Sequence, residues 1–271
     1  MNKSLSIKPF AFPKFRIIAY WLTTAIIVLE TAAGAEWDLA QNPFVSTVMH
    51  QLGYPLYVLT IIGVWKILAV VALLAPGFPR IKEWAYAGIF FVYSGAAVSH
   101  FASGDVAHAW GPFFFTLIEI ASWSLRPTSR RLTSMANSSG FDEKNQHESS
   151  RGRRIVYWIA LVLVEFSMLS AAVTEIIHFS GNVEGIVHQL GYPMYFLTIQ
   201  GVWKLLAGIA ILLPRTPILK EWAYAGIFFS MTGATASNAF CHLGAGHILS
   251  PLFIAGLAVL AWALRPAMQW L

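Results

Sequence analysis

The chain contains eight apolar segments of about 20 residues, the length at which an α-helix spans the hydrocarbon core of a bilayer. Four lie in each half, at 16–36, 55–75, 84–102, 109–126, 155–176, 193–213, 222–242 and 248–265. Charged residues make up 11% of the chain, against about a quarter in an average soluble domain. Because so few charges cannot cover a water-facing surface, the sequence predicts an all-α integral membrane protein with eight transmembrane helices.

The second half of the sequence repeats the first. The hexamer HQLGYP stands at 50–55 and, unchanged, at 188–193, and EWAYAGIFF stands at 83–91 and 221–229. Because each copy of the duplicated unit has an even number of spans, both copies should face the same way. We therefore expect two parallel four-helix bundles, related by an axis along the membrane normal.

The expected domains are a first membrane repeat at 1–126 and a second at 154–271. Between them, residues 127–153 are polar, rich in Ser and Asn, and without apolar periodicity. Such a composition predicts a flexible cytoplasmic linker.

The positions of Lys and Arg predict the orientation. They occur before the first span, after the second, in the linker, after the sixth span and in the C-terminal tail, while the alternate loops have none. Cytoplasmic loops carry the excess of Lys and Arg, so both termini should lie in the cytoplasm and the protein in the cell (inner) membrane. Because the basic residues lie in these segments, we attribute the net charge of +5 to the orientation of the chain in the membrane. We expect the lipid bilayer as the partner, and no nucleic acid.

Four residues are expected to start or pack helices. Pro55 and Pro193 stand where the second span of each repeat begins, a position that tolerates proline because the first N–H groups have no helical partner. Glu83 and Glu221 begin the third and seventh spans on the cytoplasmic side. A carboxylate in the first helical turn favours the positive end of the helix dipole, so we expect these glutamates to cap their helices.

The motifs HQLGYPLY, GVWKILAVVALLAP, RIKEWAYAG and SGAAVSH resemble the DoxX-like family of four-helix membrane proteins. The resemblance runs over nearly all of both halves, so the chain looks like a tandem fusion of two such units. Some relatives are described as subunits of thiosulfate:quinone oxidoreductase or as partners of redox enzymes, which implies a membrane location and a redox association. The second half departs from the pattern where Ser99-His100 becomes Ser237-Asn238. A function carried by His100 would therefore belong to the first half only.

Two lysines lie deep inside predicted spans. Lys66 and Lys204 are each about ten residues, or roughly 15 Å, from the cytoplasmic end of their helix. A lysine at this depth costs on the order of 3 kcal/mol, so a carboxylate is expected beside each. We predict that Lys204 pairs with Glu165 and Lys66 with Glu119, with Glu30 as a second available acid. Such pairs either hold helices together or place the lysine to bind a proton, an anion or a quinone.

A second polar group is predicted near the outer face of the membrane. Its members are histidines and acids at the outer ends of the spans: Glu36, Asp38, His50, His100, Asp105, His108, Glu175, His178, Glu184, His188, His242 and His247. Histidine and carboxylate bind transition metals, and the same groups can relay protons. No two of them follow a metal-ligand spacing on one helical turn. Plain helix capping is the favoured interpretation, ahead of a proton or quinone pocket and of a metal site.

The sequence lacks the common catalytic motifs. It has no Walker loop, GxGxxG, GxSxG or CxxC motif, and its single cysteine, Cys241, excludes a two-cysteine relay within the chain. We therefore expect a non-catalytic or accessory membrane subunit that docks a redox partner or forms a homo-oligomer. The alternatives are a quinone-linked oxidoreductase component and a small-solute or proton transporter.

Overall fold

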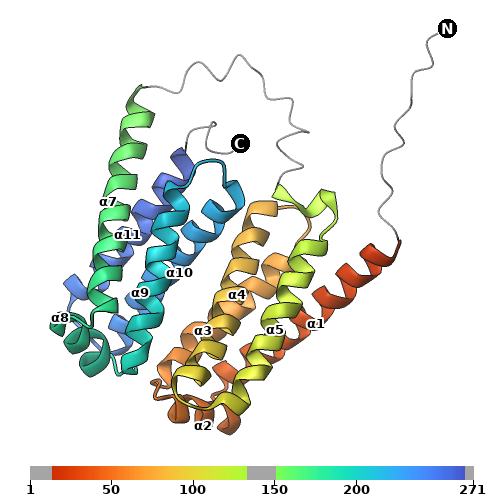
Figure 1. Ribbon diagram of the computed structural model, residues 1–271, viewed down its shortest axis with the longest axis horizontal. Coiled ribbons are helices and arrows are strands. Elements are labelled where there is room, and N and C mark those ends of the chain that lie inside the picture. Colours follow the sequence, from red (N-terminus) through yellow and green to blue (C-terminus); the bar gives the residue numbers. More distant parts are fainter. Residues whose placement is uncertain (1–13, 133–150, 266–271) are drawn as a thin grey trace.

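The computed structural model describes residues 14–132 and 151–265. The described residues are helical, with no β-strand among them, so the predicted all-α class is confirmed. A helix occupies each predicted segment: α1 (Lys14–Leu39), α3 (Tyr57–Leu74), α4 (Pro79–Ala102), α5 (Val106–Leu125), α7 (Arg151–Ile176), α9 (Met194–Leu212), α10 (Pro217–Phe240) and α11 (Ala245–Leu264) (Figure 1). The first four form what we call the first repeat, and the last four the second repeat. Most of the predicted linker, from residue 133 to 150, lies outside the described residues.

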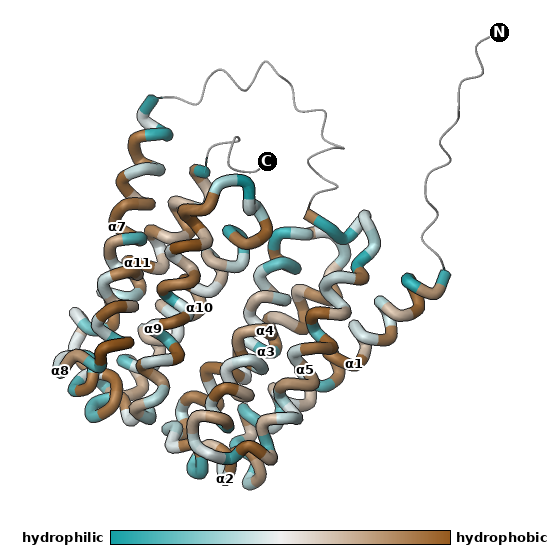
Figure 2. Tube along the Cα trace, in the orientation of Figure 1, coloured by the Kyte–Doolittle hydropathy of each residue, from teal (hydrophilic) through white to brown (hydrophobic). Residues whose placement is uncertain are grey.

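Six of the eight helices are long and apolar enough to cross a membrane, namely α1, α3, α4, α7, α9 and α11. The other two, α5 and α10, are 20 and 24 residues long but fall below that level of hydropathy. Buried polar side chains such as Glu119 in α5 and Lys220 and Glu221 in α10 account for part of the difference. Apolar residues occupy much of the middle of the helices, and polar residues gather toward their ends (Figure 2).

The four helices of each repeat pack in a ring. In the first repeat, α1 and α4 each pack against both α3 and α5. In the second repeat, α7 and α10 each pack against both α9 and α11. The repeats meet mainly along α4 and α10, with α3 contacting α10 and α4 contacting α9 (Figure 1). Equivalent helices therefore face each other across the interface between the repeats.

Short helical segments follow the first long helix of each repeat. They are α2 (Pro43–Leu52) in the first repeat, and α8 (Ser180–Asn182) and the π-helical turn η3 (Val183–Gln189) in the second. The hexamers begin in α2 and η3 and leave them through Gly53 and Gly191. These glycines have φ angles of 76° and 77°, a left-handed conformation that glycine adopts without a steric penalty. The sequence patterns predicted spans and not these segments, which are too short to cross a membrane.

The two hexamer regions contact each other across the interface between the repeats. The Tyr57 hydroxyl donates to the Leu190 carbonyl at 2.7 Å, and the Tyr195 hydroxyl donates to the Leu52 carbonyl at 2.6 Å. Each bond is the repeat-related copy of the other. The hexamer is thus found twice because the unit is duplicated, and both copies contribute to one shared interface.

The second long helix of each repeat starts beside its proline. Pro193 directly precedes α9, and Pro55 lies two residues before α3, close to the predicted positions.

Further along α9, Gly201 faces α7, where an added Cβ would lie 2.7 Å from Ile176 Cγ1 and 2.9 Å from the Ala172 carbonyl oxygen. Small residues allow such close approach of helix backbones in membranes.

The close packing of α7 and α9 predicts that Gly201→Ala destabilises the protein. The added methyl group has to push the helices apart, and overpacking of this kind costs roughly 1–3 kcal/mol. We expect a lower apparent Tm for the purified protein in detergent. Gly233→Ala in α10 is the matched control, because a Cβ there would have no atom within 4 Å while the gain in helix propensity is the same. Equal Tm values for the two variants would contradict the close packing.

Candidate functional site

Each buried lysine pairs with an acid from the preceding long helix. Lys66 Nζ lies 2.7 Å from Asp38 Oδ2, and Lys204 Nζ donates to Glu175 Oε1. Asp38 and Glu175 are each the last residue but one of their helix, so the two pairs are equivalent in the repeats. None of the four side chains is more than 13% exposed. Charges are tolerated at such burial when they are paired and hydrogen-bonded.

The expectation of an acid from another helix beside each lysine is met, but the predicted partners, Glu119 for Lys66 and Glu165 for Lys204, are wrong. A helical side chain leans toward the N-terminus of its helix, and on α3 and α9 that end lies beside the last turn of α1 and α7. Counting depth from the cytoplasmic end alone therefore pointed to the wrong acids. Within the described residues, the carboxylates of Glu119 and Glu165 are buried and have no hydrogen-bond partner. Glu30 forms no ion pair there either.

A cavity of about 1300 Å³ lies between the two repeats. Both lysines line it, together with Asp38 and Glu30, and its walls include the aromatic side chains Trp65, Trp84, Phe91, Tyr93, Trp203 and Phe228. Ligand sites are typically clefts of about 300–1,000 Å³ with mostly apolar walls and a few convergent polar groups. The cavity is somewhat larger than this but has the same kind of lining, and its wall includes both lysines, which are 138 positions apart in the chain and come from opposite repeats.

Glu83 does not cap its helix, because it lies past the first turn of α4 and its side chain binds elsewhere. Its Oε1 accepts a hydrogen bond from Arg126 at 2.7 Å. Its Oε2 accepts from the Trp123 ring nitrogen at 2.8 Å and from that of Trp222, in the other repeat, at 3.3 Å. The carboxylate thus joins three helices, one of them across the interface between the repeats.

Glu221 makes the same contacts in the second repeat. It accepts from Arg265 at 2.5 Å, from Trp262 at 2.8 Å and, across the interface, from Trp84 at 3.1 Å. The prediction that the two glutamates cap helix starts is therefore wrong. The sequence did contain a signal, since the tripeptide Leu-Arg-Pro stands at the end of the fourth span of each repeat and supplies the arginine both times.

The predicted outer-face residues do not form one cluster. His100, Asp105 and His108 come together, Asp38 binds Lys66, Glu175 binds Lys204, and His178 shares a hydrogen bond of 2.9 Å with the Thr198 hydroxyl. The remaining members are exposed: Glu36, His50, Glu184, His188, His242 and His247. Within 14–132 and 151–265, no three His, Cys, Asp or Glu side chains are placed to hold a metal ion.

Asp105, in the turn between α4 and α5, connects two histidines. Its Oδ2 lies 2.9 Å from His100 Nδ1 and its Oδ1 lies 2.7 Å from His108 Nδ1. The hydrogen bond with His108, and after it the one with His100, hold the pKa of Asp105 below its ordinary value. Both histidines therefore face an ionised carboxylate at neutral pH.

Comparison with known proteins identifies both repeats. The model of the DoxX-like family matches residues 22–122 and again residues 159–263. No curated protein and no solved structure matches the chain. The resemblance drawn from the hexamers and the KEWAYAG motifs is therefore confirmed over both halves of the chain.

Proposed function

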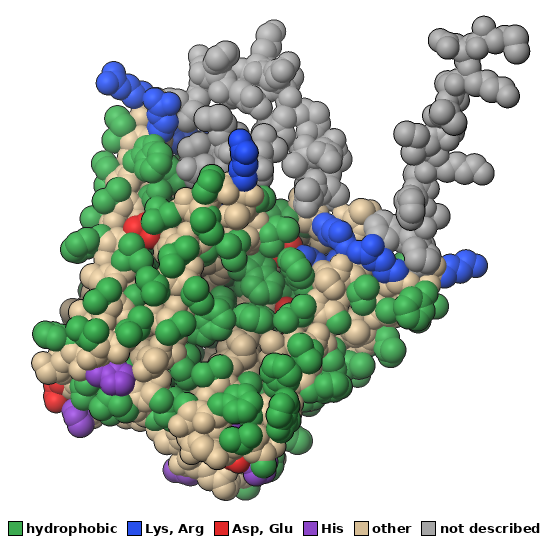
Figure 3. Space-filling model, viewed as in Figure 1, with side chains coloured by type: hydrophobic (Ala, Val, Ile, Leu, Met, Phe, Trp, Pro, Cys, Tyr) green, Lys and Arg blue, Asp and Glu red, His purple; other side chains and the backbone are tan. Residues whose placement is uncertain are grey.

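Because the chain belongs to the DoxX-like family, as a tandem duplication of its unit, we propose that it is an inner-membrane protein that holds a quinone for a redox system. In this proposal the eight long helices cross the bilayer as two parallel four-helix bundles, with both termini in the cytoplasm. The side-chain distribution supports this orientation. Figure 3 shows Lys and Arg gathered at one end of the visible face and histidines at the opposite end, as expected when basic residues mark the cytoplasmic side.

The cavity between the repeats is the observation that carries the proposal. A quinone has a flat ring, two carbonyl oxygens that accept hydrogen bonds, and an apolar tail. Trp65 and Trp203 supply aromatic surfaces from both repeats against which a ring can pack. The Lys66 and Lys204 ammonium groups each have three N–H donors, of which one is used by the paired acid. The residues of the cavity therefore fit a quinone head group.

The chain's own residues bind and orient the ligand in this proposal. A bound quinone would supply two-electron chemistry, and the lysines would hold its carbonyl oxygens. A single cysteine excludes an internal dithiol relay. We therefore propose that a partner protein exchanges the electrons and that this chain acts as its accessory membrane subunit.

A proton or small-solute transporter is the second candidate. The observation that favours it is the pair of buried acids, Glu119 and Glu165, that have no hydrogen-bond partner within the described residues. Ionisable groups inside membrane helices commonly mark ion or proton pathways. Purified protein that carries no quinone would favour this candidate.

The proposal predicts that the purified protein contains bound quinone. Organic extraction followed by mass spectrometry should find quinone well above the level of an empty lipid-nanodisc control. The double variant Lys204→Met with Glu175→Gln removes one of the two cavity ammonium groups without leaving an unpaired charge, and we expect it to lose most of the quinone. Lys220→Met is the control, because Lys220 is a buried lysine of the same repeat that does not line the cavity.

Two results would count against this proposal. Unchanged quinone content in the double variant would remove Lys204 from the ligand site. An equal loss in Lys220→Met would show that any disturbance of the second repeat releases the ligand.

A further inference from the structure

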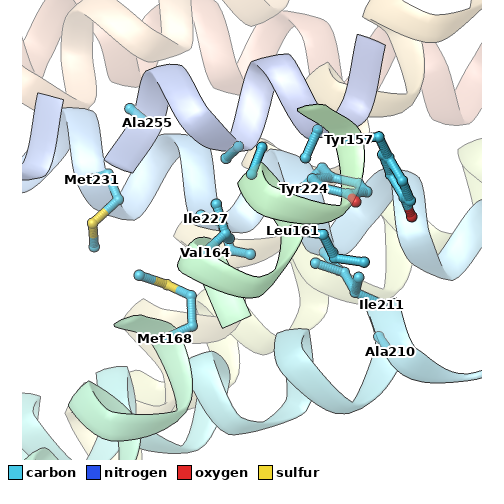
Figure 4. Packing of buried hydrophobic residues seen from close by; sticks show 14 residues of the cluster. Tyr157, Leu161, Val164, Met168, Ala210, Ile211, Tyr224, Ile227, Met231 and Ala255 are labelled. Carbon is cyan, nitrogen blue, oxygen red and sulfur yellow. The ribbon is translucent and has the colours of Figure 1, made fainter. Parts of the chain in front are cut away.

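The two repeats differ in what fills the space between their helices. In the second repeat, a cluster of mainly apolar side chains from α7, α9, α10 and α11 fills it (Figure 4). Met168 and Met231 belong to this cluster. At the matching positions of α1 and α4, the first repeat has Thr31 and Tyr93, whose hydroxyls lie 3.4 Å apart.

The same difference appears on the last helix of each repeat. The Ser122 hydroxyl of α5 lies 2.7 Å from the Thr24 hydroxyl and 2.9 Å from that of Tyr86. Ala261 stands at the matching position of α11, so Tyr224, the counterpart of Tyr86, meets no serine hydroxyl there. Burying polar groups costs free energy unless they are hydrogen-bonded. Beside an apolar cluster of its own, the first repeat therefore has hydroxyl contacts in its interior that the matching positions of the second repeat lack.

At the outer face, the first repeat connects the cavity to water through the two histidines on Asp105. His100 is only 6% exposed and lines the cavity, whereas the side chain of His108 is 73% exposed. Because both rings use Nδ1 toward Asp105, the Nε2 atom of each is directed away from the carboxylate. His100 Nε2 forms no hydrogen bond within the residues that the structure describes.

The second repeat has no such connection. Asn238 takes the place of His100 on α10 and donates to the backbone carbonyl of His247 at 2.8 Å. The following turn, 241–244, reads CHLG and contains no carboxylate. The first repeat therefore provides the position to be tested, and the second repeat provides a matched control within the same chain.

We propose that His100 is the outer polar anchor of the cavity and takes up a proton when the ligand binds. The inference rests on the proposed function, because the ligand is the quinone of the cavity. Neutral His100 donates Nδ1–H to Asp105 and keeps a lone pair on Nε2. As the ligand binds, a proton from the solvent adds to this Nε2 lone pair and converts His100 to an imidazolium ion that the Asp105 carboxylate balances.

The imidazolium ion then donates Nε2–H to a ligand carbonyl oxygen. No covalent bond of the ligand is broken, and the proton comes from the solvent. Asp105 and His108 are the charged and titratable groups that face His100 from the turn and from α5. From the α2–α3 connection, Tyr54 shares a hydrogen bond of 2.9 Å with Ser99, and both line the cavity with His100. These two hydroxyls complete the polar outer end of the cavity.

Calorimetry with ubiquinone-1 tests the inference on the purified full-length protein. Titrations near pH 6.5, about the ordinary pKa of histidine, in two buffers of different ionisation enthalpy measure the protons taken up per ligand bound. The wild-type protein should take up a measurable fraction of a proton. His100→Asn, which introduces the residue of the second repeat, should abolish this uptake and weaken binding severalfold. His247→Asn should match the wild type in both quantities.

Asp105→Asn provides a second variant in case His100→Asn is not recovered from the membrane, and its proton uptake should also be lost. Binding to the wild type without proton uptake would overturn the inference, as would uptake retained in His100→Asn or Asp105→Asn. Both results leave quinone binding intact. Absence of ubiquinone-1 binding to the wild type would instead overturn the proposed function, and this inference with it.

Discussion

Glu221→Ala is expected to lower the free energy of unfolding by about 3–5 kcal/mol, the cost of leaving a buried charge without its partner. The charge in question is that of Arg265. Both side chains of the pair are 0% exposed, so the Arg265 charge is shielded from bulk water. The same substitution removes the acceptor of Trp262 and of Trp84, the second of which comes from the other repeat. A large fall in apparent Tm, or in the denaturant needed to unfold the protein in mixed micelles, should report the loss.

A double variant separates charge from packing. Glu221→Leu with Arg265→Met removes both charges, and replacing a buried pair with apolar groups is often neutral. We expect it to recover most of the stability that Glu221→Ala loses. If the single and double variants were equally unstable, the charge would not be the cause. A Glu221→Ala protein with the wild-type Tm would contradict the buried pair itself.

Asp38→Ala is the second substitution with a large expected effect. It leaves the Lys66 ammonium without its paired carboxylate, and the Lys66 side chain is only 13% exposed. Removing one partner of a buried pair costs about 3–5 kcal/mol, and we place this variant toward the lower end because Lys66 retains some access to the cavity. The measurement is again the apparent Tm of the purified protein. Combining Asp38→Ala with Lys66→Met should restore part of the loss.

Two controls decide which acid neutralises Lys66. Glu36→Ala removes an exposed acid from the same helix, and surface substitutions usually change stability by less than about 0.5 kcal/mol. Glu119→Gln preserves the shape of the acid that the sequence favoured, and we expect little effect on stability because the Glu119 carboxylate binds no lysine in the structure. Wild-type stability in Asp38→Ala together with a large loss in Glu119→Gln would reverse the assignment.

The sequence predicted the helices well because bilayer thickness imposes a length on every apolar segment. Each of the eight runs is a helix, and the repeated hexamers indicated the duplication that the family match supports. The contact between the hexamers could not be predicted this way. Tyr57 and Leu190 are far apart in the chain, and periodicity within one span carries no information about packing between repeats.

The site was predicted in part. Lys66 and Lys204 were correctly expected to need acids, since an unpaired ammonium is unstable in hydrocarbon. The choice of Glu119 and Glu165 failed because depth along a helix does not fix which neighbour a long side chain reaches. A comparison of the ends of α1 and α7 could have found Asp38, which stands where the second repeat has Glu175. The acids of equivalent pairs occupy equivalent positions.

Photoaffinity labelling with an azido-quinone tests most directly whether the cavity between the repeats binds a quinone. The full-length protein in nanodiscs would be irradiated with the probe, digested and analysed by mass spectrometry, with and without excess ubiquinone-1. We predict that competable label falls on the cavity-lining stretches of α3 and α9, around Trp65 and Trp203. Label confined to the lipid-facing surfaces of α1 and α7, or label that ubiquinone-1 does not displace, would contradict a quinone site between the repeats.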